Sequence, residues 1–517
     1  MQCANISLRP PPGVHTSALG PFVRFVFSIN PSYEGPTTII FARIHCGKAE
    51  AGRQTYSFRE GDELEKEMKS EKHEQYSRFR YTAMLFALAA IVVAPAHASG
   101  PLEKVIYSFQ GGNDGIQPEG GLIADRNGNL YGTTQVGNGL NGCISGCGTV
   151  FELSPPSVPG GSWTETILYR FQAGDDDGAA PSGSLLMDAS GNLYGVTAGT
   201  TNSGTVFELS PPVSEGGAWT EKILYLFPPT DTSKGADPYG DLVFDRKGNL
   251  YGTASGGTHL CPVGEANGGC GVVFELSPST DTSARWQEKV LHNFSRHETD
   301  GFQPRAGLAV DRDGTLYGTT FYGGLNGGGT VFQMKRVLGE WQETILYNFD
   351  PSGGAFPQAP LKLDNAGRLF GTATDASLNG CVGSACGAVF ELSPPQTEGG
   401  AWSIAFLYTF SGARDGGNPI RGRLLQDQAG NIYGTTELGG LKNNFTRNNG
   451  TIFKLSPPIV AGDPWIESTL HEFSGSHYND GGQPLASLVF VKGKFYGTTS
   501  SGGTRNLGTI FSLTIVP

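Results

Sequence analysis

The chain has 517 residues, of which 77 are Gly and 32 are Pro, and only 16% are charged. Its 30 Phe and 18 Tyr, placed in regular apolar runs, are enough for a large core, which argues against a disordered chain and favours an all-β protein with many turns. The formal net charge of -12, without a Lys/Arg cluster in the C-terminal four-fifths, argues against a nucleic-acid partner, because phosphate binding needs a basic patch.

A signal-like segment lies at residues 68–98. Arg78 and Arg80 precede an apolar run over 84–94, and an Ala-His-Ala triplet follows at 96–98. These three parts are typical of a secretory signal peptide, so we expect cleavage after Ala98 and a secreted or periplasmic protein. The run is short for a membrane span, and a retained N-terminal anchor is the alternative.

Residues 1–67 precede this segment, although a signal peptide normally begins close to the initiator. Met68 opens the sequence Met-Lys-Ser-Glu-Lys-His, which suits a normal signal start. We therefore hypothesise that Met68 is the true start and that residues 1–67 are a disordered, mis-assigned extension.

Seven segments after residue 100 share one pattern: G-N-L-Y-G-T-T, a Gly-rich loop, then G-T-V-F-E-L-S-P-P. The aromatic residue of the first half recurs at positions 131, 194, 251, 317, 370, 433 and 496. The spacing ranges from 53 residues (317 to 370) to 66 residues (251 to 317), which indicates variable loops on a constant core.

Each repeat is predicted to form four short strands, which in the first repeat are 121–125, 129–134, 149–153 and 165–171. Short alternating runs bounded by Gly, Pro and Asn are the usual strand signal. Seven such units predict a seven-bladed β-propeller, because one blade cannot bury both of its faces. An open solenoid is the alternative.

The two ends of the repeat region predict how the ring closes. The region opens at 103–109 with a fourth strand and ends at 508–513 with a third strand. We therefore expect the N-terminal strand to complete the last blade of a propeller spanning 101–517, which hides two strand edges. Each of the six tryptophans precedes a fourth strand: Trp163, Trp219, Trp286, Trp341, Trp402 and Trp465.

This repeat resembles the GloVer (Gloeobacter/Verrucomicrobia-type) tandem repeat of exported bacterial proteins, over about residues 101–517. The resemblance implies export and a repeat class without an established activity. Some members carry a C-terminal sorting anchor, which we do not expect here because the chain ends at 514–517 directly after a strand. The Asp-x-x-Gly-Asn-Leu-Tyr turn resembles that of NHL-type propellers more loosely.

Six cysteines of the repeat region form three close pairs, Cys143/Cys147, Cys261/Cys270 and Cys381/Cys386. Each pair falls in the loop between the second and third strands of a different repeat. We predict three disulfides, which suit an exported protein. Zinc binding is the weaker alternative, because no His accompanies the first and third pairs.

Loops from strand four to strand one, and from strand two to strand three, emerge on the same face of a propeller, and we predict that this face binds ligands. Its candidate residues are Asp114, Asp177, Asp300, Asp415 and Asp480 of an Asp-Gly-x-x-Pro motif, with His259, His297 and His477. The aspartates suit Ca²⁺ or polyol contacts, but we favour a turn-capping role. The series Asp125, Asp188, Asp245, Asp311, Asp364 and Asp427 indicates turn capping more firmly.

Catalytic motifs are missing from the sequence, which has no G-x-S-x-G, H-E-x-x-H or Walker pattern. His292 and His471 take the place of a Tyr that other repeats have, so we expect them to pack within blades. We predict no catalytic residue, no metal site and no cofactor, with Ca²⁺ as the alternative.

The sequence thus favours a monomeric, non-catalytic binding or scaffold module for an extracellular glycan or protein, without a membrane span after signal cleavage. The alternative is a carbohydrate-active glycosidase or lyase, using an unrepeated carboxylate pair near the propeller axis. An enzyme is expected to break the sevenfold symmetry with acidic or His residues in a deep central pocket, whereas a scaffold is expected to show a shallow, repetitive face.

Overall fold

A computed structural model describes residues 102–515, apart from 138–146, 173–176, 200–202, 215, 230, 258–260, 262–268, 282–283, 298, 353, 375–385, 398, 441–448, 461 and 476–478, and short stretches nearer the N-terminus. The chain forms two units, Met1–His97 and Ala98–Pro517. The predicted signal peptide lies outside the described residues.

The first unit contains two short antiparallel strand pairs. Strand β1 (Arg24–Phe27) pairs with β2 (Ile40–Arg43), and β3 (His45–Cys46) pairs with β4 (Tyr56–Ser57).

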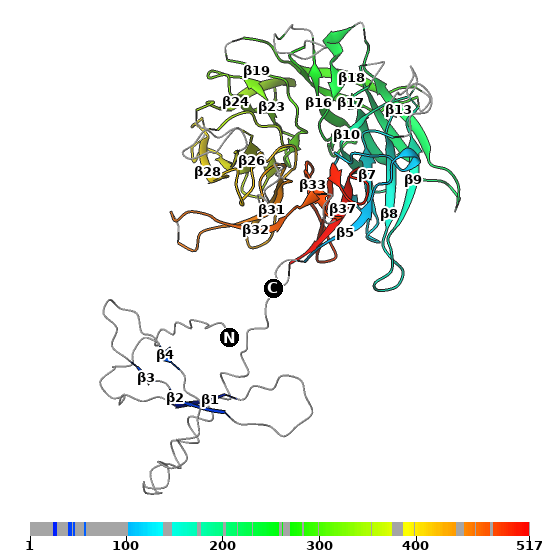
Figure 1. The fold of residues 1–517 in the computed structure, drawn as a ribbon. Helices are drawn as coiled ribbons and strands as arrows, with labels where there is room; N and C mark the ends of the chain where they lie inside the picture. Colours follow the sequence, from blue (N-terminus) through cyan, green and yellow to red (C-terminus); the bar gives the residue numbers. More distant parts are fainter. Residues whose placement is uncertain are drawn as a thin grey trace, which may run out of the picture. The chain divides into compact units, whose positions relative to one another are not determined.

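The second unit is an all-β propeller of seven antiparallel sheets, which we number as blades 1 to 7 (Figure 1). Blade 1 contains β6 (Ile123–Ala124), β7 (Leu130–Thr134), β8 (Thr149–Ser154) and β9 (Thr164–Arg170). Blade 2 contains β10 (Pro181–Met187), β11 (Leu193–Thr197), β12 (Thr205–Ser210) and β13 (Thr220–Leu226). Blade 3 contains β14 (Ala236–Pro238), β15 (Val243–Phe244), β16 (Leu250–Gly256), β17 (Val272–Ser277) and β18 (Gln287–Asn293).

Blade 4 contains β20 (Ala309–Val310), β21 (Leu316–Thr320), β23 (Thr330–Val337) and β24 (Glu340–Asn348). Blade 5 contains β25 (Lys362–Leu363), β26 (Leu369–Ala373), β27 (Ala388–Ser393) and β28 (Ser403–Thr409). Blade 6 contains β29 (Leu425–Gln426), β30 (Ile432–Thr436), β31 (Thr451–Ser456) and β32 (Ile466–Glu472). Blade 7 contains β34 (Val489–Val491), β35 (Lys494–Thr499), β37 (Thr509–Thr514) and the N-terminal β5 (Leu102–Ser108). Short 3-10 turns lie at η3 (Gly112–Asp114) and η4 (Thr232–Lys234).

Ring closure occurs as the sequence predicts. Strand β5 pairs antiparallel with β37, with Val105 opposite Phe511 and Glu103 opposite Leu513. Figure 1 shows the blue N-terminal strand beside the red C-terminal one. The closure gives both strands a partner and so leaves no open end to the ring.

The hydrophobic core lies between neighbouring blades. Seven buried clusters occupy the seven interfaces, and one of them joins Phe109, Ile510 and Tyr496 of blade 7 to Phe151 of blade 1. The Phe that follows each fourth strand packs edge-on against the third-strand Phe of the next blade, with ring centroids 5.0 to 5.5 Å apart. Such pairs add to the stabilisation from apolar burial.

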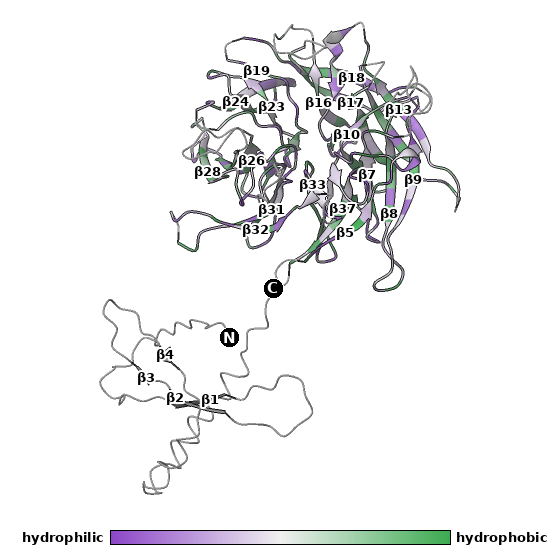
Figure 2. Ribbon diagram, viewed as in Figure 1, coloured by the Kyte–Doolittle hydropathy of each residue, from purple (hydrophilic) through white to green (hydrophobic). Residues whose placement is uncertain are grey.

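The outer strands are more polar. Figure 2 shows many hydrophilic residues on β9, where exposed residues alternate with less exposed ones along most of the strand. Trp residues at the start of fourth strands cover the neighbouring blade: Trp163 lies 5.7 Å from the ring of Tyr496, and Trp341 lies 5.9 Å from Tyr251.

A contact that we call the proline latch fastens each blade to the next. In each latch, the proline follows a residue whose backbone φ is positive, between 51° and 60°. The N–H of that residue donates to a backbone carbonyl of the preceding blade. The residue that carries this carbonyl stands directly before the Gly at the start of the third strand. That Gly, at φ +95° in the case of Gly271, lies against the ring of Pro304: an added Cβ would sit 2.3 Å from Pro304 Cδ. The latch prolines are Pro118, Pro181, Pro238, Pro304, Pro357, Pro419 and Pro484.

Candidate functional site

The two kinds of loop expected to share a face are hydrogen-bonded to each other. Strand β19 (Gly301–Phe302), in a four-to-one loop, pairs with β22 (Tyr322–Gly323), in a two-to-three loop. Strands β33 (Gly481–Gly482) and β36 (Ser501–Gly502) repeat this pairing at blade 7. The two kinds of loop therefore lie on the same face at these blades, and we call it the loop face.

The chain segments that follow the latch prolines converge on one pocket, which we call the axial pocket. Each of the seven segments contributes at least one lining residue, among them Glu119, Ser184, Asp241, Arg305, Gln358, Arg421 and Ser487. The latches hold these segments, so the rigid ring fixes the position of the pocket wall. The cavity volume is about 40 Å³, which is room for a few water molecules or one small polar group.

The lining residues break the symmetry of the repeat. The residue directly after the latch proline is different in every segment: Glu119, Ser182, Tyr239, Arg305, Gln358, Ile420 and Leu485. The latch itself recurs at all seven interfaces, whereas the wall that it supports does not repeat. A repeated latch therefore supports a pocket whose lining residues differ from blade to blade.

Charged side chains of both signs line this wall, among them two arginines and two carboxylates. Arg421 forms an ion pair with Glu119, with Nη1 2.5 Å from Oε2, and its guanidinium lies 5.4 Å from the centroid of Tyr239. The pair joins segments that are 302 residues apart in the chain. Both side chains keep some exposure, 36% for Arg421 and 20% for Glu119.

A second arginine beside the pocket spans several blades. Arg423 Nη2 lies 3.6 Å from Asp241 Oδ2 and donates to the carbonyl of Leu308 at 3.4 Å. Its Nε is buried and has no hydrogen-bond partner among the described residues. Asp241 also accepts the backbone N–H of Ser184 at 2.7 Å.

Arg305 completes the set, with its guanidinium 4.2 Å from the ring centroid of Phe321 and a hydrogen bond to Gln303. Three arginines, Arg305, Arg421 and Arg423, meet three carboxylates, Glu119, Asp241 and Glu437, so the region has a formal charge of 3 - 3 = 0 in a chain whose net charge is -12. Guanidinium groups recognise carboxylate, sulfate or phosphate by paired hydrogen bonds. Glu119 and Asp241 each lie beside an arginine, which does not suit these two residues as a general acid and base pair.

The aspartates of the Asp-Gly-x-x-Pro motif lie at the ends of fourth strands and do not line the axial pocket. In each case the aspartate accepts the backbone N–H of the residue directly after the Phe that follows the fourth strand. The distance is 2.8 Å for Asp177, Asp300, Asp415 and Asp480, and Asp114 accepts the equivalent N–H of Gln110. This is the turn-capping arrangement. Their part in ligand binding stays a prediction.

The second aspartate series also caps turns. Asp188 accepts the backbone and side-chain N–H groups of Asn192 and the hydroxyl of Tyr194. Burial alone would raise the pKa of Asp188, but these hydrogen bonds lower the pKa below its usual value. Equivalent bonds hold Asp125, Asp245, Asp311, Asp364 and Asp427.

A set of buried glutamates was not predicted. In six of the seven blades a Glu stands on the fourth strand opposite the Leu or Met of the F-x-[LM] motif: Glu103, Glu165, Glu221, Glu288, Glu343 and Glu467; Ile404 takes this place in blade 5. Burial, followed by the charge of Asp114, raises the pKa of Glu165 to about 8. Burial and Asp177 raise the pKa of Glu221 to about 7.

Each of these glutamates meets a residue pair of the preceding blade, and we call the group an interblade triad. Its other members are the fourth-strand Tyr or His and the loop Asp, as in Tyr107, Asp114 and Glu165. The Tyr107 hydroxyl donates to Asp114 at 2.8 Å. The recurring Glu was visible in the repeat, but its partners come from another blade and leave no local spacing to detect.

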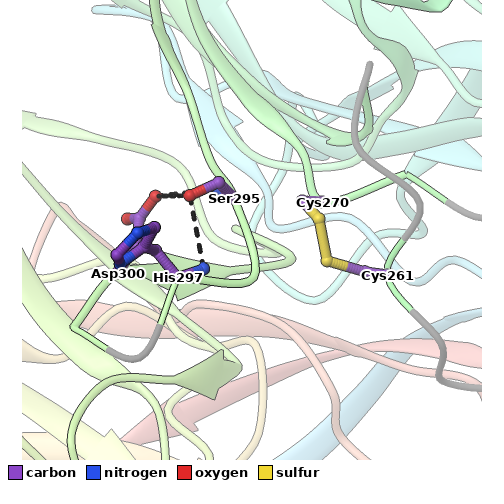
Figure 3. The surroundings of a disulfide bond; sticks show 5 residues. All are labelled: Cys261, Cys270, Ser295, His297 and Asp300. Atoms are coloured by element: carbon purple, nitrogen blue, oxygen red, sulfur yellow. Dashed lines mark hydrogen bonds between the residues drawn. A yellow bond between two sulfur atoms is a disulfide. The ribbon is translucent and has the colours of Figure 1, made fainter.

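Histidine replaces the tyrosine in two interblade triads. His292 lies with Asp300 and Glu343, and His471 lies with Asp480 and Glu103. Both rings also pack against the following Phe, with centroids 4.6 and 4.7 Å apart, as expected for residues of blade packing. His297 donates its backbone N–H to Ser295 Oγ in the nearby loop (Figure 3), while His259 and His477 lie outside the described residues.

The Cys261–Cys270 disulfide is formed as predicted, with Cα atoms 5.2 Å apart (Figure 3). Cys147 and Cys386 are also disulfide-bonded, and their predicted partners Cys143 and Cys381 lie outside the described residues. The carbonyls of Cys147, Cys270 and Cys386 accept the latch hydrogen bonds of the next blade. The disulfides therefore anchor variable loops directly at the latches.

The fold and loop face define a seven-bladed β-propeller with an axial pocket, consistent with the resemblance to NHL-type propellers. The chain belongs to the Gloeobacter/Verrucomicrobia repeat family, which matches residues 93–283, 262–398 and 376–516. No curated protein matches the chain. Within the described residues, no helix is long and apolar enough to cross a membrane.

Three solved structures illustrate the comparison with known folds. A protein of unknown function from Dyadobacter fermentans has a TM-score of 0.40 at 12% identity, covering 81% of this chain and 100% of its own. An ulvan lyase of polysaccharide lyase family PL25 has a TM-score of 0.44 at 12% identity, with 79% and 96% covered. A putative gluconolactonase has a TM-score of 0.33 at 13% identity, with 65% and 89% covered.

Proposed function

We propose that the protein is an exported, non-catalytic binding module that captures the acidic groups of an extracellular glycan at the axial pocket. The observation that supports this proposal is the non-repeated wall of the pocket, in which Arg305 and Arg421 place two guanidinium groups at the axis of a protein whose net charge is -12. Arg305 and Arg421 offer charge-assisted hydrogen bonds to a carboxylate or sulfate. Tyr239 and Gln358 add an aromatic face and an amide, which suit a sugar ring and its hydroxyls.

The size of the cavity suits one acidic substituent better than a whole sugar ring. A volume of about 40 Å³ accepts a carboxylate or sulfate, so the rest of the polymer would lie across the loop face. An acidic polysaccharide presents such groups repeatedly along the chain, which raises the effective concentration of the second contact after the first.

The wall breaks the sevenfold symmetry, as expected of an enzyme, but the pairing of Glu119 and Asp241 with arginines favours binding over catalysis. Glu119 is engaged by Arg421, and Asp241 lies beside Arg423 and accepts the Ser184 N–H. A glycosidase needs one carboxyl group that donates a proton and another that acts as base or nucleophile. Carboxylates that are paired with arginine suit a fixed wall for recognition.

A binding titration tests the proposal. Polygalacturonate, heparin and neutral dextran would be titrated into the wild type and into Arg421→Ala. We expect binding of an acidic polymer, no binding of dextran, and a loss of at least about tenfold in affinity for the variant, because a charge-assisted pair is removed. Binding is also expected to weaken with added salt.

Arg312→Ala is the matched control, since Arg312 lies on the strand-one to strand-two turn of blade 4 and outside the pocket. This variant should bind like the wild type. Equal affinity of the wild type and Arg421→Ala, with both folded by circular dichroism, would rule out the axial pocket. Release of reducing ends or of unsaturated uronates would instead favour the carbohydrate-active enzyme.

A further inference from the structure

The two histidine-bearing interblade triads differ chemically from the others. At the other interfaces the fourth-strand residue is a tyrosine: Tyr107, Tyr169, Tyr225, Tyr347 and Tyr408. A tyrosine hydroxyl donates to the loop Asp, as Tyr408 does to Asp415 at 3.1 Å. An imidazole in the same place adds a nitrogen lone pair to a group that already contains two carboxyl groups.

In the first of these triads the three side chains converge from two blades. His292 stands on β18, Asp300 lies in the loop that follows it, and Glu343 stands on β24 of the next blade. One ligand atom from each residue lies within 4.8 Å of the others. His292 Nε2 is 3.5 Å from Asp300 Oδ1, and these side chains are only 24% and 13% exposed.

The converging atoms are buried and lack hydrogen-bond partners among the described residues. These atoms are His292 Nε2, Asp300 Oδ1 and Glu343 Oε1. The other oxygen of Asp300 accepts two hydrogen bonds from Ser295, which orient the carboxylate (Figure 3). Unsatisfied buried polar atoms are costly, and three of them at one point indicate a group that all three can share.

We propose that His292, Asp300 and Glu343 bind a divalent transition metal ion, for which Zn²⁺ is the best match. One imidazole nitrogen and two carboxylate oxygens suit Zn²⁺, and three protein ligands leave one position for water. Two atoms each about 2.1 Å from a tetrahedral zinc lie about 3.4 Å apart, which agrees with the separation of His292 and Asp300. Calcium fits less well, because Ca²⁺ takes oxygen ligands.

The second triad brings the same three residue types together at the closure of the ring, with more of its atoms partnered. His471 Nε2 is hydrogen-bonded to Asp480 Oδ2 at 3.3 Å and lies 3.9 Å from Glu103 Oε2, and Asp480 Oδ2 also accepts two hydrogen bonds from Ser474. The Glu103 side chain is only 9% exposed, and its Oε1 has no hydrogen-bond partner in the described structure. Since Glu103 stands on β5, a metal ion here would fasten the N-terminal strand to blade 6.

Metal content and a visible probe test the proposal. The full chain would be stripped with EDTA, reloaded with Zn²⁺ and analysed by mass spectrometry for bound metal, and Co²⁺ would replace Zn²⁺ to give an absorption spectrum. We expect about two ions per chain, from two sites of the same ligand type. His292→Tyr should lower the content to about one, and His292→Tyr with His471→Tyr to about none.

Tyrosine is the natural residue at five equivalent positions, so these variants are expected to keep the fold. A second variant, Glu343→Gln, removes a ligand charge while keeping its size. His297→Ala is the control, because His297 is an exposed residue of the same loop. Arg421→Ala should keep its metal, which separates this proposal from the one on glycan binding.

Several results would overturn the assignment. Unchanged zinc content or cobalt absorption in His292→Tyr would exclude the first triad, as would a wild type that binds no metal after reloading. A wild type that binds one ion, together with a His292→Tyr variant that binds none, would support the first triad and exclude the second. Zn²⁺ should also raise the melting temperature of the wild type but not of the double variant.

Discussion

Buried glutamates between blades give the protein a predictable response to pH. Glu221 has a buried Oε1 without a hydrogen-bond partner in the described structure, and burial together with Asp177 raises its pKa from 4.5 to about 7. Because the folded state favours the protonated form, the stabilisation is complete below pH 4.5 and is lost as the pH rises through about 7.

Glu221→Gln should therefore stabilise the protein at pH 8 and change little at pH 4. The gain is expected to be about 1–2 kcal/mol, since partial exposure reduces the effect of the full pKa shift. Urea unfolding at both pH values measures it, with the exposed Glu340→Gln as the control. If the difference in unfolding free energy between variant and wild type were the same at both pH values, ionisation of Glu221 would not destabilise the folded protein.

At the same scale, the sequence predicted the aspartates better than it predicted the glutamates. Asp125 and its equivalents contact residues four to six positions further along the chain, so a local turn motif contains their whole environment. The partners of Glu221 come from the preceding blade. Neither a local motif nor strand alternation reports which side chains meet between blades, so the raised pKa values and the histidine triads could not be derived from the repeat.

At the scale of the structural element, the proline latch holds each blade against the next and so makes the ring rigid. Gly271 and Gly248 belong to the same blade and have similar φ angles, +95° and +86°. An added Cβ at Gly271 would clash with Pro304, whereas at Gly248 it would meet nothing within 4 Å. The pair therefore separates simple backbone strain from the close contacts at Gly271, which are with the latch proline and with the Ala254 carbonyl oxygen at 2.9 Å.

Gly271→Ala is expected to lower the free energy of unfolding by more than about 3 kcal/mol, and Gly248→Ala by only about 1 kcal/mol. Chemical unfolding of both variants measures the difference. Similar losses in the two variants would mean that the latch prolines can shift, and that the blades are held mainly by their apolar interfaces.

Most strands were predictable as elements, and the reasons are physical. The second to fourth strands carry the alternation and turn residues that specify a strand, and they lie where the repeat places them. The first strand is only two residues long in five blades, because the preceding segment turns toward the axis to form the pocket wall. The small β19/β22 and β33/β36 sheets were not predicted, since Gly-rich loops carry no such pattern.

At the scale of the whole molecule, closure by β5 sets a requirement on export. The closing strand begins at Leu102, shortly after the predicted cleavage site at Ala98. We expect the mature protein to begin near Ser99 and to yield no peptide from residues 1–67. Mass spectrometry of the native protein checks both statements, and an N-terminus beyond Ser108 would contradict a ring closed by β5.

The whole ring also explains why sequence analysis could not name the residues of the axial pocket. Its wall takes one segment from each of seven blades, and the residues that give it character are those that do not repeat. Sequence reasoning predicted a binding face from its loops and selected the recurring aspartates there. In the structure these lie at the ends of fourth strands, whereas the arginines line or flank the axial pocket.

One measurement tests the central claim, that this propeller binds an acidic glycan at its axis without cleaving it. A defined acidic polysaccharide would be incubated with the protein and analysed by size-exclusion chromatography with light scattering. We predict that wild-type protein elutes with the polymer, that Arg421→Ala does not, and that the length of the polymer stays unchanged. Elution of wild-type protein and polymer as separate species, or shortening of the polymer, would contradict the claim.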